Sequence, residues 1–218
     1  MKVIKFIGKA LGFIALGLVI LFAISFGVIA YNASRTQIDY QEEIYKYSDK
    51  YNIDPILTAS IIKVESDFDN EAQSKQGANG LMQLMEDTAR HSAELVGIDY
   101  YPEKLNDVDY NLDLGVGYFN YLYNYYNDVD LALAAYNGGV GNVDEWIEDG
   151  IIDPDNMNHL DIPFEETRHY VSRVNSNYQV MKKFYSKALP TDEELSDLGG
   201  LAVRNFKVFV GDILNNIM

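Results

Sequence analysis

The stretch from Ile53 to Met85, IDPILTASIIKVESDFDNEAQSKQGANGLMQLM, decides the fold of this chain. Asp54 and Pro55 are the residue types that favour an N-cap and the first position of a helix. Apolar residues then recur every three or four positions, which is the spacing of a helix with one buried face. Glu65 ends this apolar segment, and a polar loop containing glycine follows at residues 67–79. The stretch therefore predicts a carboxylate at the end of a buried helix.

The same kind of periodicity continues through most of the chain. It predicts further helices at residues 38–51, 80–96, 111–127, 130–137, 141–148 and 165–187. No segment shows the sustained alternation of polar and apolar residues that a half-buried strand would have. We therefore predict a mainly α fold, with one compact domain at residues 38–188.

The N-terminus combines a basic start with a long apolar segment. Residues 1–10 hold three lysines, and residues 11–30 are uncharged and mostly apolar. Twenty helical residues span about 30 Å, which is the thickness of a hydrocarbon core. The apolar segment therefore predicts a single-pass membrane anchor, followed by a tether at residues 31–37. The lysines predict that residues 1–10 lie in the cytoplasm and that the chain after the anchor lies outside. A signal peptide cleaved after Ala30 is the alternative.

The C-terminal residues 189–218 are predicted to form a helical tail. Its apolar residues fall mostly along one helical stripe, at Val203, Phe206, Val210, Ile213, Leu214 and Ile217. This stripe fits a helix that packs back on the domain, lies on a membrane surface or binds a partner, and the sequence leaves these three alternatives open.

Charge and composition exclude several classes of function. The formal net charge is −16, and because the only charged residues among the first thirty are three lysines, residues 31–218 carry −19. Such an acidic surface argues against nucleic acid as a partner, since phosphates need lysine and arginine. The chain has no cysteine, and His91, His159 and His169 do not have the spacing of metal ligands. We therefore expect neither a metal site nor another cofactor.

Four short motifs stand in order between Asp54 and Lys187. They are Glu65-Ser66 with Phe68 and Ser74 after it, the run GLMQLM at Gly80–Met85, the run AYNGG at Ala135–Gly139 and the run ETRHYV at Glu166–Val171. Together these motifs resemble the catalytic domain of the soluble-type lytic transglycosylases, which share a fold with goose-type lysozyme. A single motif of this kind is weak evidence, but four in order at compatible spacing are strong.

The chain departs from the family pattern at four positions. Asn70 and Glu86 each stand where the family usually has proline. Gly138 replaces the usual alanine, and Val140 replaces another proline. None of these changes removes a group that the resemblance assigns to catalysis. The acidic side chain of Glu86 suits the first turn of a helix, where the helix dipole favours negative charge.

The resemblance implies cleavage of the β-1,4 bond between N-acetylmuramoyl and N-acetylglucosaminyl units of peptidoglycan. Glu65 protonates the leaving oxygen while the N-acetyl group of the substrate attacks its own anomeric carbon. Glu65 then takes the proton of the 6-hydroxyl group of the same sugar, which closes a 1,6-anhydro ring without consuming water. The other acids, Asp67, Asp69 and Glu71, lie in the loop and are expected to be surrounded by solvent, and a substrate-assisted route needs only one acid.

The resemblance also implies a set of substrate-binding residues around Glu65. Tyr136 and Tyr170 are expected to make hydrogen bonds around the Glu65 carboxyl group. Burial of Glu65 against apolar groups such as Ile61 and Met85 is expected to keep it protonated. Ser74, Gln83 and Asn137 are expected to position sugar hydroxyl or acetamido groups, and Glu166 to lie near the N-acetyl side. The full set is Ser74, Gln83, Met85, Tyr136, Asn137, Glu166 and Tyr170.

Two other functions remain open at this point. A muramidase of the goose-lysozyme type would cleave the same bond with water. A non-catalytic wall-binding or scaffold module of a secretion or conjugation apparatus would bind the wall without cleaving it. The expected partners are the glycan strands of peptidoglycan, the membrane through the N-terminal helix, and secretion, conjugation or wall-synthesis machinery.

Overall fold

The computed structural model describes residues 2–35, 38–185, 189–190 and 197–217. These residues form helices and loops, and the only bridges between extended segments in them are two isolated pairs, Gln73 with Asn79 and Asn79 with Leu84. The prediction of a mainly α fold is confirmed. The chain divides into two compact units, one at residues 38–189 and one made of residues 1–37 and 190–218.

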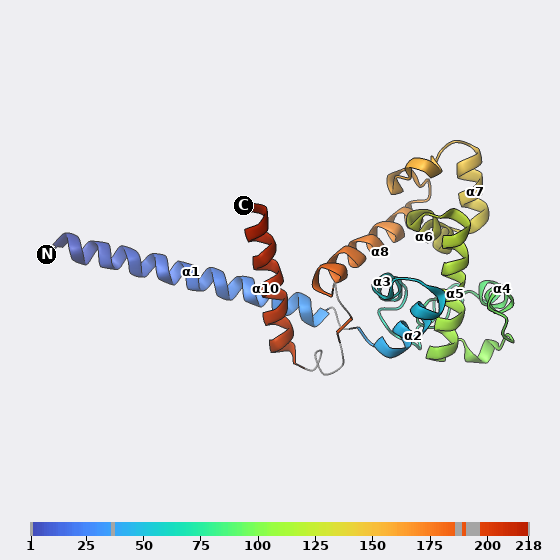
Figure 1. Cartoon of the computed structure of the whole chain (residues 1–218), viewed down its shortest axis with the longest axis horizontal. Coiled ribbons are helices and arrows are strands. Elements are labelled where there is room, and N and C mark those ends of the chain that lie inside the picture. The colour runs from blue at the N-terminus through green and yellow to red at the C-terminus, as the bar shows by residue number, and fades with distance from the viewer. Residues whose placement is uncertain (1, 36–37, 186–188, 191–196, 218) are drawn as a thin grey trace. The chain divides into compact units, whose positions relative to one another are not determined.

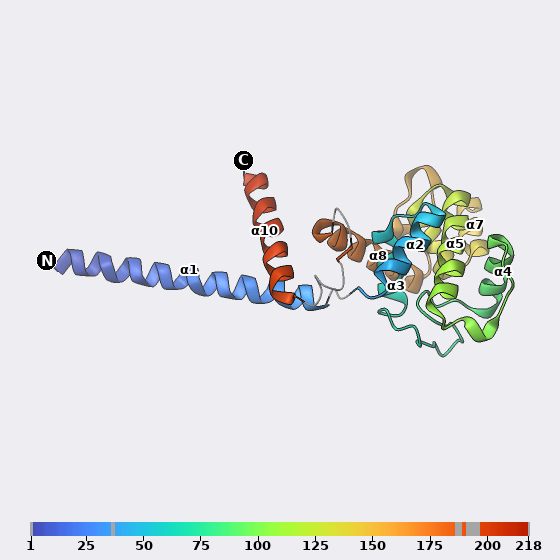
Figure 2. The ribbon, with the colours of Figure 1, turned by 60° about the horizontal axis from the view of Figure 1, so that its bottom comes forward.

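The larger unit is a bundle of helices in which α3 is central. Figures 1 and 2 both show α3 between the two longest helices of this unit, α5 and α8. α3 packs against α8, α5 packs against α2, α4 and α6, and α6 also packs against α7 and α8. The bounds of the helices are Gln41–Tyr51 (α2), Pro55–Glu65 (α3), Glu86–Val96 (α4), Val108–Tyr126 (α5), Val129–Gly138 (α6), Val140–Glu148 (α7) and Glu165–Phe184 (α8). Short turns of 3₁₀ helix lie at Pro102–Lys104 (η1), Pro154–Asn156 (η2) and His159–Asp161 (η3).

The α3 helix begins and ends as the sequence predicts. The Asp54 carboxylate accepts a hydrogen bond from the Ile56 amide at 2.9 Å, and Pro55 occupies the first turn. Glu65 is the last helical residue. Every residue from 56 to 62 is buried, so the helix is fixed by packing on all sides before it delivers Glu65 at its end.

The helix predicted at residues 80–96 begins later than expected, at Glu86. Residues 80–85 instead form a tight turn, because Asn79 and Leu84 exchange two backbone hydrogen bonds of 3.0 Å each. Gly80 has a φ of 74° and Gln83 a φ of 45°, and this left-handed backbone cannot continue into an α-helix. Glu86 lies in the first turn of α4, as the helix dipole favours.

The smaller unit contains α1 at Lys2–Arg35 and α10 at Leu198–Ile217. The two helices contact each other, and the rings of Phe22 and Phe206 meet edge to face at 5.1 Å. The predicted tail is therefore helical at residues 198–217 and packs on α1, while its residues 191–196 lie outside the described part of the chain.

The α1 helix covers most of the residues that were predicted to form a membrane anchor and a tether. The segment predicted as a tether at residues 31–37 is helical as far as Arg35, because no glycine or proline interrupts it and α1 continues through it. Residues 36–37 lie outside the described residues, as do residues 186–188 at the predicted end of the domain. Within the described ranges, no helix combines the length and the apolarity needed to cross a membrane.

Candidate functional site

Glu65 is a partly buried carboxylic acid beside α8. Burial raises the pKa of Glu65 from 4.5 to about 7, while the Tyr170 hydroxyl and the Arg173 guanidinium lower it by smaller amounts. Removal of a carboxylate from water disfavours its charged form, and the two neighbours on α8 do not compensate for this loss. Glu65 is therefore present in both protonated and ionised forms near neutral pH.

Tyr170 of α8 is a polar neighbour of Glu65. Its side chain is only 2% exposed, and its hydroxyl lacks a partner of full hydrogen-bond geometry among the described residues. Burial and the charge of Glu65 raise the pKa of Tyr170 well above its usual range. The hydroxyl therefore keeps its proton and can donate a hydrogen bond to the Glu65 carboxylate or to a bound ligand.

Tyr136 also lies near Glu65, but its hydroxyl is already engaged. It donates a hydrogen bond of 2.8 Å to the backbone carbonyl of Met82. Burial raises the pKa of Tyr136, and the charge of Glu65 raises it further. Tyr136 thus joins α6 to the turn at residues 80–85 and places its aromatic ring beside the acid.

The turn at residues 80–85 is held by Asn111, a fully buried residue in the first turns of α5. The Met82 amide donates to the Asn111 side-chain oxygen at 2.8 Å. The Asn111 amide nitrogen donates to the carbonyls of Asn79 at 3.0 Å and Leu105 at 2.7 Å. At Gly80, a β-carbon would collide with the Asn111 side chain and the Leu105 carbonyl.

Sequence reasoning missed Asn111 as a site residue. The available signal was a single amide side chain at the start of a predicted apolar helix, immediately before Leu112. A buried amide needs several partners, and this one finds them in the loop segment. The end of α3 is tied to the same turn, because the Ser66 hydroxyl donates to the Leu81 carbonyl at 2.8 Å.

Ser74 and Gln83 shape the loop that faces this turn. The Ser74 hydroxyl accepts from the Ala78 amide at 3.0 Å, and its proton remains available as a donor. The Gln83 amide nitrogen donates to the carbonyls of Ala72 at 3.0 Å and Gly80 at 2.9 Å. Since both amide hydrogens of Gln83 hold the loop, its side-chain oxygen is the group that can accept from a ligand.

Met85, Asn137 and Glu166 lie at the surface of the same region. Met85 is 43% exposed, whereas Ile61 is fully buried. Asn137 and Glu166 are both exposed, near the end of α6 and at the start of α8. These helix ends meet closely, because a β-carbon on Gly138 would lie 3.0 Å from the Thr167 hydroxyl.

The other acids near Glu65 in sequence are solvated. Asp69 and Glu71 are exposed, and the Asp67 side chain is 73% exposed and forms an ion pair with Lys63. They lie in the loop after α3, as expected. Within the described residues, no cluster of three or more histidine or acidic side chains has the geometry to hold a metal ion.

A polar pocket of about 460 Å³ is lined in part by the same loop. Gln73 and Asn79 of the loop form one wall, and Glu86, Tyr100 and Glu103 contribute to the others. Gln73 donates to the Asn79 side-chain oxygen at 3.1 Å, which holds this wall in place. The pocket is separate from the surroundings of Glu65 described above.

Comparison with known families finds one match in the larger unit. The transglycosylase SLT domain matches residues 42–151. The chain is 31% identical over 161 residues to the soluble lytic murein transglycosylase of Escherichia coli K12, covering 72% of this chain and 25% of that protein. It is 29% identical over 185 residues to the membrane-bound lytic murein transglycosylase C of Pectobacterium atrosepticum, covering 73% of this chain and 51% of that protein.

Solved structures show the same likeness. The 70 kDa soluble lytic transglycosylase of Escherichia coli superposes with a TM-score of 0.62 at 30% identity, over 68% of this chain and 25% of that one. An inactive glutamate-to-glutamine mutant of the lytic transglycosylase Slt of Pseudomonas aeruginosa gives a TM-score of 0.61 at 29% identity, over 72% and 26% of the two chains. This chain therefore spans about a quarter of the length of these soluble relatives.

Proposed function

Because this chain belongs to the transglycosylase SLT family, we propose that it is a lytic transglycosylase that cleaves the glycan strands of peptidoglycan. The observation that carries the proposal is Glu65, which ends the central helix α3 in a partly buried position with a pKa raised to about 7. Relatives that match most of this chain are named lytic murein transglycosylases, and a solved structure of one of them resembles this structure over 68% of the chain.

We propose that Glu65 acts alone as acid and then as base. As an acid it protonates the oxygen of the β-1,4 bond while the N-acetyl group of the same substrate attacks the anomeric carbon. As a base it removes the proton of the 6-hydroxyl group, whose oxygen displaces the N-acetyl oxygen and closes the 1,6-anhydro ring. The proton that Glu65 gives to the leaving sugar is replaced by the proton of the 6-hydroxyl group, so no water is consumed.

The raised pKa of Glu65 supports both halves of this cycle. A group that must give and then take a proton works best when its pKa lies near the working pH. With a pKa of about 7, a substantial fraction of the enzyme starts in the protonated form at neutral pH. The exposed acids Asp67, Asp69 and Glu71 are too solvated to share this role.

The remaining site residues are proposed to bind the substrate. The Tyr170 hydroxyl steadies the Glu65 carboxylate after the first proton transfer. The free groups of Ser74 and Gln83 bind sugar hydroxyl or acetamido groups, while their other hydrogen bonds hold the loop. Met85, Tyr136, Asn137 and Glu166 complete the proposed surface.

We further propose that residues 38–188 form the catalytic domain and that residues 11–30 anchor it to the cell membrane. The anchor rests on the sequence, namely twenty uncharged and mostly apolar residues after three lysines. Fractionation of cells tests it. The chain is expected in the membrane fraction, to resist extraction by high salt and to be released by detergent, whereas recovery in a salt wash would refute the anchor.

The activity is tested by digestion of purified peptidoglycan sacculi. Wild-type protein is expected to release muropeptides with 1,6-anhydro ends, and Glu65→Gln to release none. Asp67→Asn provides a matched control, because it also removes one carboxylate close to the end of α3 but from an exposed position. Products with reducing ends would instead indicate a muramidase, and binding of sacculi without release would indicate a scaffold module.

A further inference from the structure

Three tyrosines form a stripe on one side of α5, and we call Tyr118, Tyr121 and Tyr125 the tyrosine ridge. Their spacing of three and four residues places them one above another on a helix. The ring centroids of Tyr118 and Tyr121 lie 6.3 Å apart with nearly parallel planes, and those of Tyr121 and Tyr125 also lie 6.3 Å apart. The ridge is therefore a continuous row of aromatic rings.

The ridge begins at the site of Glu65. The ring of Tyr118 lies 5.8 Å from that of Tyr136, and Tyr136 is close enough to Glu65 for the charge of that residue to raise its pKa. From there the row leads along α5 away from the acid. Tyr125 lies seven positions after Tyr118, which is a rise of about 10 Å along the helix and is comparable to the length of a disaccharide.

Packing of the core does not account for the ridge. The buried side of α5 consists of other residues, such as Leu112, Phe119 and Leu122. Tyr121 is 36% exposed and Tyr125 is 56% exposed, so the outer part of the ridge presents its rings to solvent. Large aromatic side chains held at a surface commonly mark a binding site, because they offer an apolar face and a polar edge.

The rings of the ridge are held in fixed orientations. His91 of α4 meets the rings of Tyr118 and Tyr121 edge to face at 6.3 Å and 5.9 Å. At the outer end, the hydroxyls of Tyr125 and Tyr126 donate to the Asp144 carboxylate of α7 at 3.3 Å and 2.9 Å. A surface whose side chains are ordered before binding loses less entropy when a ligand docks.

The chemistry of the ridge fits a sugar chain better than other ligands. Sugar rings have apolar C–H faces that stack on aromatic rings and hydroxyl groups that project sideways into water. Next to the ridge, Asn120 and Asn124 carry side-chain amides on the same helix, and the Asn124 amide donates to the Asn120 oxygen at 3.0 Å. Nucleic acid, which also stacks on aromatic rings, is disfavoured by the net charge of −16.

We propose that the tyrosine ridge is an extended subsite on which the glycan strand lies, with successive sugar rings stacked on Tyr118, Tyr121 and Tyr125. The inference rests on the proposed function, because it places this subsite on one side of the bond that Glu65 cleaves. It predicts that the protein binds long glycan strands more tightly than short ones. The higher affinity for long strands comes from contacts between the ridge and sugars that lie beyond those next to Glu65.

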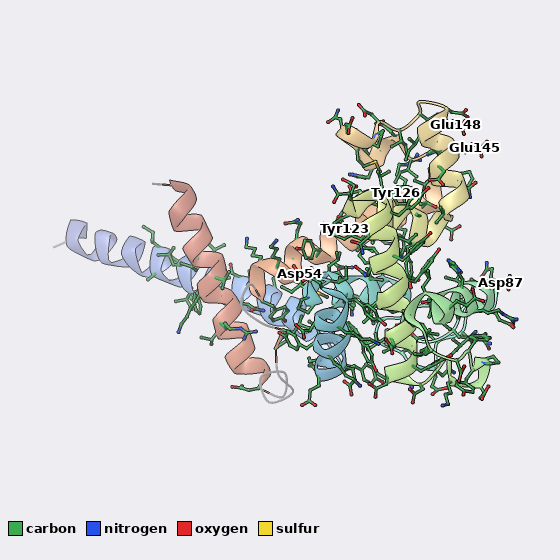
Figure 3. All side chains as sticks on the ribbon, turned by 45° about the vertical axis from the view of Figure 1, so that its right-hand side comes forward. Asp54, Asp87, Tyr123, Tyr126, Glu145 and Glu148 are labelled. Carbon is green, nitrogen blue, oxygen red and sulfur yellow. The ribbon has the colours of Figure 1, made fainter. Side chains whose placement is uncertain are left out.

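The test compares two variants of the full chain. Tyr121→Leu combined with Tyr125→Leu removes two rings of the ridge but keeps apolar side chains in their place. Tyr123→Leu is the matched control, because Tyr123, which Figure 3 labels, lies on the same helix two residues from both Tyr121 and Tyr125, and this spacing places it on the other side of α5. Binding of purified glycan strands is measured in the Glu65→Gln background, where the strands stay intact, and cleavage is measured with Glu65 present.

For strands long enough to cover the ridge, the double variant is expected to show a Kd and a KM about tenfold higher, with kcat little changed. For the shortest fragments that bind beside Glu65, and for the Tyr123→Leu control, both constants are expected to stay as in the wild type. Tyr121→Phe combined with Tyr125→Phe keeps the rings and is expected to bind like the wild type, which separates stacking from a general loss of structure.

Two results would overturn the subsite. One is a double leucine variant that binds and cleaves long strands as well as the Tyr123→Leu control does. The other is an equal loss of affinity for short and long strands. Failure of the proposed function looks different, because wild-type protein would then release no anhydro products. A loss of glycan affinity confined to the ridge variants would still support the subsite in that case.

Discussion

The raised pKa of Glu65 makes a prediction about stability that does not depend on substrate. Replacement of Glu65 by glutamine removes the ionisable group but keeps its shape and polarity. Below about pH 4.5, both the folded and the unfolded chain hold the Glu65 proton, so the two proteins should be equally stable. Between pH 4.5 and about 7, the folded state holds its proton while the unfolded state has released it. The wild-type protein therefore loses stability relative to the variant as the pH rises through this range.

The magnitude follows from the two pKa values. Each pKa unit corresponds to about 1.4 kcal/mol, so the gap between 4.5 and about 7 corresponds to about 3 kcal/mol. Water reaches part of the carboxylate and reduces this figure, so the Glu65→Gln variant should be about 2 to 3 kcal/mol more stable at pH 8. Equal stability is expected at pH 4.

Unfolding in urea, followed by tryptophan fluorescence, measures this difference. The single tryptophan, Trp146, is buried in the larger unit and packs edge to face on Phe164 at 4.9 Å. A glutamine variant that is no more stable than the wild type at pH 8 would contradict the raised pKa of Glu65. A gain of equal size at pH 4 and pH 8 would also refute it, because the effect would then be independent of ionisation.

Three further predictions concern residues around the site. Tyr170→Phe removes a hydroxyl that lowers the pKa of Glu65, so the pKa of Glu65 should rise. The alkaline limb of the pH profile of kcat/KM should then shift to higher pH by about one pH unit. A limb at the same pH as in the wild type would contradict this. Asn111→Leu removes three buried hydrogen bonds and should lower the free energy of unfolding in urea by about 3 kcal/mol or more. A decrease of less than about 1 kcal/mol would show that the turn at residues 80–85 does not depend on Asn111. Asp54→Ala removes the N-cap of α3 and should lower the free energy of unfolding in urea by about 1 kcal/mol. Asp54→Asn keeps a side-chain oxygen at this position and should retain most of that stability.

Local signals in the sequence were sufficient to predict the helices. Asp54, Pro55 and the apolar spacing after them determine the start and length of α3, and both agree with the structure. Asn52, in left-handed backbone, and Gly139, with a positive φ of 88°, each end a helix, as their residue types favour. The start of α4 was placed too early, because the Asn79–Leu84 turn is closed by hydrogen bonds that periodicity does not reveal.

The site was harder to predict, because it depends on contacts between distant segments. The motifs identified Glu65 and Tyr170, but only the packing of α3 on α8 places them together. The sequence did not show that the Tyr136 hydroxyl is taken by the Met82 carbonyl. Nor did it identify Asn111, whose role arises from three partners that lie 6 to 32 residues away.

The central claim is that Glu65 takes its second proton from the substrate rather than from water. Digestion of sacculi in water labelled with heavy oxygen, followed by mass spectrometry of the released muropeptides, tests this directly. The wild-type protein is expected to release 1,6-anhydro products that contain no label, and Glu65→Gln is expected to release no products. Products with a labelled oxygen at a reducing end would contradict it, because water would then have attacked the sugar.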